Sequence, residues 1–195
     1  DFQVQITMNT STLVTAGKMQ SDCDDIRVTD VGGALLPHVI EEGSAPCNNA
    51  STKIWVNIPS IPASNQTLYI YYGNPAAGNV EDGKKVFAFF DNFNQGLNGG
   101  IWTATGTTSS SGGALTITTG AIYSNSTILS SSTSYMYEYR TQWASTATDY
   151  AGMELNNTQS AAGSNTEGDK LIYMISNSAT DIAQRGFAND TSTGY

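Results

Sequence analysis

Lys53-Ile54-Trp55-Val56-Asn57-Ile58 is the stretch that decides the fold class. Its apolar residues Ile54, Val56 and Ile58 recur with a period of two, which is typical of a β-strand that buries one face. Similar alternation, or a short aromatic and β-branched run, recurs at residues 2–8, 68–72, 115–117, 135–139 and 171–175. Only residues 11–19 could hold a helical turn, with Ser11 or Thr12 as its cap. The sequence therefore predicts an all-β protein.

The chain reads as two consecutive domains. A stretch of small and charged residues at 76–85 separates two strand-rich parts, with both cysteines before it and the Ser/Thr tracts after it. We therefore expect two β-sandwich domains, at residues 1–80 and 81–195. Both ends look cut, because a strand begins at Phe2 and the chain stops at Tyr195 without a closing strand. Either the chain is trimmed, or a neighbouring subunit supplies a strand to an open sheet edge.

Composition indicates a protein outside the cytoplasm. Charged residues make up 13% of the 195 residues, about half of the roughly 25% that is typical, so hydroxyl-rich runs must keep the surface wet. The net charge is −9 with only eight basic residues, which argues against nucleic acid and anionic membranes as partners. Apolar runs are far shorter than the roughly 20 residues of a membrane span.

The two cysteines, Cys23 and Cys47, predict a disulfide. An even number of cysteines in a chain of this composition suits an oxidising compartment, and neither belongs to a CxxC motif. On the chain-entropy model the bridge would stabilise the fold by about 3.5 kcal/mol. The alternative is a pair of unrelated buried thiols.

Several motifs in the first part follow one another in the order of a known family. They are Ala16-Gly17-Lys18-Met19, Leu35-Leu36-Pro37 and the segments 22–30, 53–63 and 68–75. Together these resemble a β-sandwich domain of unknown function from archaeal and bacterial cell-surface proteins, over about residues 1–80. Members usually have an additional opening strand, and an aromatic pair where this chain has His38-Val39.

The second part is similar to a concanavalin A-like sandwich over about 87–195, in an incomplete form. Residues 89–94, Trp102-Thr103 and 150–155 carry this likeness. The two resemblances imply an immunoglobulin-like domain followed by a jelly roll, at the cell surface, with carbohydrate as one candidate ligand.

Sequence motifs for catalysis are missing or altered. His38 is the single histidine, which argues against a His-based triad or a zinc site. We interpret His38 as a strand or turn residue. The nearest string to the glucanase motif Glu-x-Asp-x-x-Glu begins at Glu154, but Asn156 and Gln159 stand where carboxylates are needed. We therefore predict that the protein is not an enzyme and has no cofactor.

A calcium site is the weak exception. Asp22, Asp24, Asp25 and Asp30 could bind Ca²⁺, because hard cations prefer several carboxylates. Their order does not follow an EF-hand loop, and short aspartates often accept hydrogen bonds from turn amides instead. We favour the structural role.

Two features point to sugar. Asn-x-Ser/Thr sequons begin at Asn9, Asn49, Asn65, Asn125, Asn156 and Asn189, and we expect some of them to carry N-glycans where the source has that machinery. Trp55, Trp102, Trp143 and ten tyrosines could form a sugar-stacking surface, but thin β-sandwich cores need such side chains as well. We favour the core role.

Two hypotheses for function follow. The first is a glycosylated structural subunit of a cell-surface filament or pilus, which binds copies of itself by strand exchange or edge pairing. The second is a carbohydrate-binding or adhesion module of a larger surface protein, in contact with neighbouring surface proteins.

Overall fold

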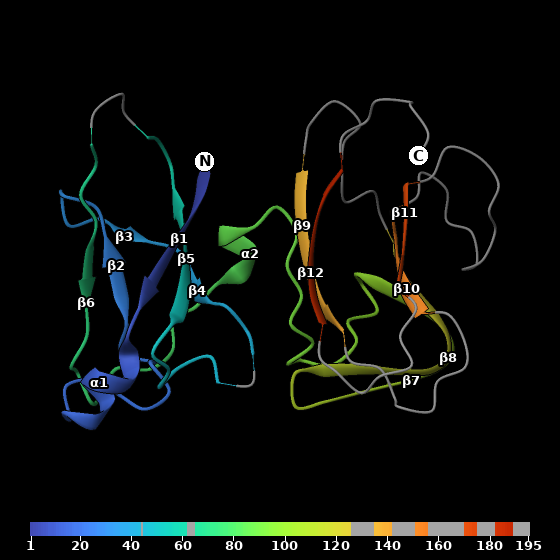
Figure 1. Cartoon of the computed structure of the whole chain (residues 1–195), viewed down its shortest axis with the longest axis horizontal. Coiled ribbons are helices and arrows are strands. Elements are labelled where there is room, and N and C mark those ends of the chain that lie inside the picture. The colour runs from blue at the N-terminus through green and yellow to red at the C-terminus, as the bar shows by residue number, and fades with distance from the viewer. Residues whose placement is uncertain are drawn as a thin grey trace. The chain divides into compact units, whose positions relative to one another are not determined.

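The computed structural model describes residues 1–43, 45–61, 65–125, 135–141, 151–155, 170–174 and 182–188 (Figure 1). The chain divides into two compact units, Asp1–Asn92 and Phe93–Tyr195. Throughout the described residues, the strands of each unit pair only within that unit.

The first sheet has the strand order β1-β5-β4. β1 (Phe2–Met8) lies antiparallel to β5 (Thr52–Ile58) along its whole length, from Phe2 opposite Ile58 to Met8 opposite Thr52. The short β4 (His38–Ile40) pairs with the other side of β5. The stretch that decides the fold class is therefore the central strand of this sheet.

The second sheet of the unit has the order β3-β2-β6. It consists of the short antiparallel strands β3 (Leu35–Leu36), β2 (Arg27–Thr29) and β6 (Tyr69–Tyr71) (Figure 1). Val28 stands at its centre, opposite Leu36 on one side and Ile70 on the other.

One core cluster contains side chains from both sheets. The period of two places Ile54, Val56 and Ile58 of β5 in it, together with Val28 and Leu36. Ile54, Val56 and Val28 are fully buried, and each such side chain contributes about 1.5–3 kcal/mol relative to an exposed position. The predicted disulfide is confirmed: Cys23 and Cys47 are bonded, with Cα atoms 5.8 Å apart, and both belong to this core.

Two short helices complete the unit. α1 (Thr10–Thr15) begins one residue earlier than the range predicted from the sequence, and its cap is Asn9, so the choice of Ser11 or Thr12 was wrong. α2 (Gly83–Val86), capped by Asp82, was not predicted. Its Val86 is buried, because the segment packs against β4 and β5 instead of crossing solvent.

The second unit consists of paired strands. β7 (Trp102–Ser111) and β8 (Ala114–Ser124) form a hairpin whose turn residues Gly112 and Gly113 both have positive φ, 59° and 75°, as a two-residue type I′ turn needs. Two further antiparallel pairs are β9 (Tyr135–Thr141) with β12 (Ile182–Ala188), and β10 (Ala151–Leu155) with β11 (Lys170–Met174).

The regular secondary structure of the described residues is mostly β-strand in small sheets, with few helical residues. The all-β prediction is therefore confirmed at this level. The finer assignment, two consecutive sandwiches of immunoglobulin-like and jelly-roll type, stays a prediction.

Candidate functional site

β1 is a sheet edge without a second partner in the part of the chain that the structure describes. Its seven residues, Phe-Gln-Val-Gln-Ile-Thr-Met, pair only with β5. Val4, Ile6 and Met8 pack against the core, whereas Gln3 and Thr7 are exposed. The strand contains no charge, proline or glycine, so it lacks the residues that usually discourage pairing with another chain.

The opposite edge of the same sheet is covered. The segment before α2 lies along β4: the Asp82 amide donates to the His38 carbonyl at 3.0 Å, and the Ile40 amide donates to the Glu81 carboxylate at 3.0 Å. Burial raises the pKa of Glu81, an effect that the hydrogen bond from Ile40 opposes. These contacts occupy the His38 carbonyl and the Ile40 amide, two of the main-chain groups by which β4 could bind a further strand, so the two edges of the sheet differ.

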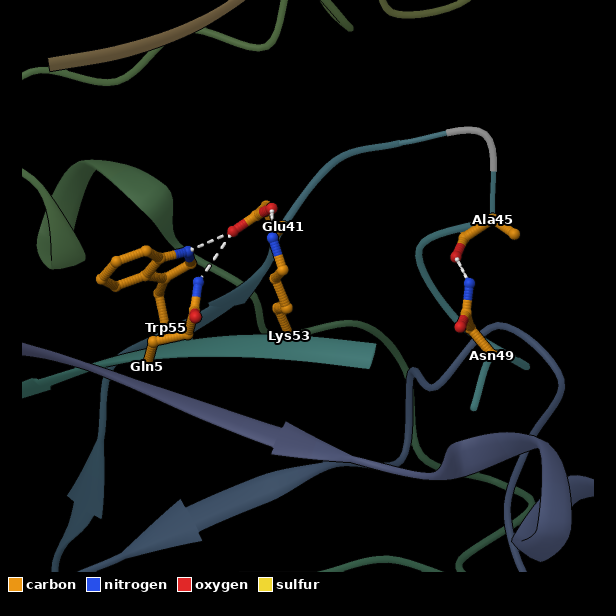
Figure 2. A network of polar contacts seen from close by, with 6 residues as sticks. All are labelled: Gln5, Glu41, Ala45, Asn49, Lys53 and Trp55. Carbon is orange, nitrogen blue, oxygen red and sulfur yellow. Dashed lines mark hydrogen bonds and ion pairs between the residues drawn. The ribbon is translucent and has the colours of Figure 1, made fainter. Parts of the chain in front are cut away.

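A carboxylate network fixes the outer face of the sheet near β1 (Figure 2). Glu41 accepts hydrogen bonds from Gln5 Nε2 and Trp55 Nε1, both at 2.9 Å, and pairs with Lys53 Nζ at 2.6 Å. Because Gln5 lies on β1 and Trp55 on β5, the network joins both strands to the start of the loop after β4. It holds the edge strand in place from outside the core.

Trp55 belongs to a second, smaller core. It is 8% exposed, packs with Val39 and Val86, and meets the Phe87 ring edge-on at 5.5 Å between centroids. The alternation in β5 therefore does not leave this indole in solvent, since the segment that includes α2 covers it. Trp55 fills a core and is not available to stack on a sugar.

Each of the four aspartates proposed as weak calcium ligands accepts a main-chain or side-chain hydrogen bond within the fold. The buried Asp25 accepts from the amides of Gln20 and Gly73. Asp22 accepts from the Asp24 amide, Asp24 from Asn79 Nδ2, and Asp30 from the Ala34 amide. Among the described residues no group of three or more His, Cys, Asp and Glu side chains is placed to hold a metal ion. In this structure the four carboxylates serve as hydrogen-bond acceptors within the fold.

His38 is a buried residue of β4, 3% exposed. Desolvation lowers the pKa of this imidazole, the hydrogen bond with the Leu36 backbone opposes the shift, and the charge of Arg27 adds to it. Of the glucanase-like string, Glu154 lies in β10, whereas Asn156 and Gln159 fall outside the described residues.

The sequons differ in what their amides do. Asn9, Asn65 and Asn125 are exposed and Asn49 is half-buried. The Nδ2 of Asn49 donates to the Ala45 carbonyl at 3.0 Å (Figure 2) and that of Asn125 to the Gly99 carbonyl at 2.8 Å. Asn156 and Asn189 lie outside the described part of the chain.

Aromatic side chains do reach solvent on the other sheet. Tyr69 and Tyr71 of β6 are 46% and 55% exposed, with ring centroids 6.5 Å apart. Trp102 is partly buried, and its ring centroid lies 6.1 Å from that of Phe93. Trp143 falls outside the described residues. The sequence prediction named the tyrosines only as a group and did not single out this pair.

Residues 22–105 match the model of a family described as a domain of unknown function, DUF2341. The match covers the disulfide, the second sheet, β4, β5 and α2, and it reaches into β7. No curated protein and no solved structure matches the chain significantly. Within the described residues, no helix is long and apolar enough to cross a membrane.

Proposed function

We propose that the protein is a non-enzymatic, extracellular structural subunit, which assembles into a cell-surface filament or pilus through the edge of β1. The observation that carries this proposal is the difference between the two edges of the first sheet. β1 presents a seven-residue uncharged edge, whereas Glu81 and Asp82 occupy the edge of β4. Covering the edge of β4 while leaving that of β1 open directs pairing with another chain in this sheet to β1.

The surrounding structure supports the same reading. A strand that is added to a sheet gains main-chain hydrogen bonds, provided that the edge is already extended and ordered. β1 meets this requirement because β5 pairs with its whole length and the Glu41 network holds Gln5 from the outer face. The disulfide and the low content of charged residues agree with an oxidising, extracellular setting.

Symmetry decides what the edge can build. If β1 binds β1 of a second copy antiparallel, with Gln5 at the two-fold axis, Gln3 faces Thr7 of the partner and the contact closes as a dimer. A filament needs a heterologous contact, in which β1 binds a different edge of the next copy. The proposed filament therefore requires that the second edge be distinct from β1.

Charge substitution at two exposed positions of β1 tests the edge. Gln3→Glu with Thr7→Glu places acidic side chains along the strand. The carboxylate at position 7 would stand opposite Lys53 of the chain's own β5, so the substitution should not destabilise the monomer. We expect this variant to keep its fold and to lose assembly, as seen by electron microscopy and light scattering. Filaments that are as abundant as in the wild type would overturn the role of β1.

A matched variant separates the two symmetries. Gln3→Lys with Thr7→Glu keeps the second substitution and reverses the charge of the first, so that antiparallel β1 strands would bring the ammonium group of one copy against the carboxylate of the other. Recovery of a two-fold dimer in this variant, without filaments, would show self-pairing and would contradict the proposed filament. Continued loss of assembly is the result expected for a heterologous contact.

One observation favours a second candidate, a carbohydrate-binding or adhesion module that includes a concanavalin A-like second domain. The exposed Tyr69 and Tyr71 rings could stack on the apolar faces of a sugar. Titration with oligosaccharides tests it: alanine at both positions should abolish binding, whereas alanine at the neighbouring exposed Tyr72 should not. Equal losses in the two variants would contradict this second candidate.

A further inference from the structure

The two polar atoms of the Asn9 amide have different roles. Its Oδ1 caps α1, accepting from the Thr12 amide at 3.1 Å and from Ser11 Oγ at 3.0 Å. Its Nδ2 donates to no residue that the structure describes, and the side chain is exposed. The nitrogen that an N-glycan would occupy is therefore free, while the oxygen is already used.

The next residue holds this amide in place. Thr10 is fully buried, its hydroxyl lies 2.7 Å from that of Thr52, and its amide donates to the Asn49 carbonyl at 3.0 Å. These contacts reach across 39 and 42 residues of sequence. Asn9 is consequently presented at a fixed position on the surface and not on a free loop.

Asn49 and Asn125 provide the contrast within the same chain. Each uses Nδ2 to bind a main-chain carbonyl, of Ala45 and of Gly99 respectively. A glycan on Nδ2 replaces one of its two hydrogens and places a bulky group beside that carbonyl. Modification at these two positions works against contacts that the folded chain makes, and modification at Asn9 does not.

We propose that Asn9, in the sequon Asn9-Thr10-Ser11, is an N-glycan acceptor whose oxygen continues to cap α1 after modification. The donor is a sugar activated at its anomeric carbon by a lipid-linked phosphate ester. A bond forms between Nδ2 and the anomeric carbon, and the bond from that carbon to the phosphate oxygen breaks. The phosphate leaves with the electron pair, and the displaced proton passes to a base of the transferase.

The test uses the full chain, secreted from a host with asparagine-linked glycosylation and purified as the folded, disulfide-bonded fraction. Peptide mass mapping should show a glycan mass on the Asn9 peptide, at higher occupancy than on the Asn49 and Asn125 peptides. Because transfer can precede folding, the folded fraction is the one in which a glycan that disturbs the Ala45 or Gly99 contact is depleted. A bare Asn9 peptide, in a host that glycosylates a control protein, would overturn the proposal, as would equal occupancy at Asn9 and Asn49.

Three variants separate the acceptor from the cap. Asn9→Asp keeps a capping oxygen but has no amide nitrogen, so it should lose the glycan mass while the unfolding midpoint of the unglycosylated chain stays unchanged. Asn9→Ala should lose the glycan mass and should also have a lower unfolding midpoint, because it lacks the capping oxygen. Ser11→Thr, which preserves the sequon, should keep the glycan. If the unfolding midpoint fell as much in Asn9→Asp as in Asn9→Ala, the division of roles between Oδ1 and Nδ2 would be contradicted. These readouts do not depend on whether the protein assembles.

Discussion

Opening the Cys23–Cys47 disulfide should remove a large part of the stability of the first unit. The bridge joins residues 24 positions apart, and the chain-entropy model assigns such a loop about 3.5 kcal/mol. Both side chains lie in the core, 2% and 9% exposed, so alanine at both positions should cost about 1–2 kcal/mol more through lost packing. A unit of this size has a free energy of unfolding of about 5–14 kcal/mol.

The assay is urea unfolding of the full chain, followed by tryptophan fluorescence. The sequence has three tryptophans, so phenylalanine at positions 102 and 143 leaves Trp55, which is buried in the first unit, as the reporter. Comparing oxidised with reduced protein changes only the covalent bond, whereas Cys23→Ala with Cys47→Ala also removes the sulfur atoms. The first comparison should give a loss of about 3.5 kcal/mol and the second about 4.5–5.5 kcal/mol.

A loss below about 1 kcal/mol on reduction would refute the entropic reasoning. It would mean that residues 23–47 are already confined in the unfolded chain, so that the bond constrains nothing further. An unchanged slope of the urea dependence on reduction would agree with this cause, because the slope follows the surface that unfolding exposes.

Two further predictions concern buried positions. Burial lowers the pKa of His38, so this imidazole binds a proton more tightly in the unfolded chain than in the folded one. The stability of the fold should therefore fall as the pH drops from about 6.5 toward the folded pKa of His38. Urea midpoints at pH 7.5 and 5.0 should therefore differ less in His38→Gln than in the wild type, and an equal difference would contradict the assignment. A Cβ at Gly83 would overlap the Phe90 ring, whereas one at Gly78 would meet no atom within 4 Å. Gly83→Ala should cost about 1–3 kcal/mol in thermal unfolding, and equal melting temperatures for the two alanine variants would count against this packing.

Local patterns in the sequence were enough to predict strands such as β1 and β5 and the disulfide, but they did not predict β7 or β12. The period of two at Ile54, Val56 and Ile58 follows directly from a strand whose one face meets the core. The β7–β8 turn carried a signal that was not used: Gly112-Gly113 is a dipeptide typical of two-residue hairpins. The pairing of Cys23 with Cys47 needed no topology, because the chain has two cysteines.

Long-range contacts explain what local patterns missed. Asn9, Ser11 and Thr12 are all good capping residues, and the choice among them is made by Thr10, which binds residues 39 and 42 positions away. The small and charged residues at 76–85 predict a boundary between the two parts, but they do not reveal that Glu81 accepts a hydrogen bond from an amide 41 residues away.

Trp55 illustrates the same limit at the outer face of the sheet. Its place in an alternating strand says which side of the sheet the indole is on, but not whether another segment covers that side. Val86 and Phe87 cover it. The open edge of β1 likewise becomes visible only once the sheet order is known.

The open edge and the proposed glycan acceptor constrain one another, because β1 ends at Met8 and Asn9 follows directly. A strand that binds β1 cannot extend the ladder past Met8, since the amides of Thr10 and Ser11 already donate to the Asn49 carbonyl. Val4, Ile6 and Met8 already pack on the core, so an added strand gains main-chain hydrogen bonds and little new apolar burial. Edge pairing alone should therefore give a contact that reverses on dilution. A filament that survives dilution requires that the incoming strand also bring apolar side chains into the fold, which is strand exchange.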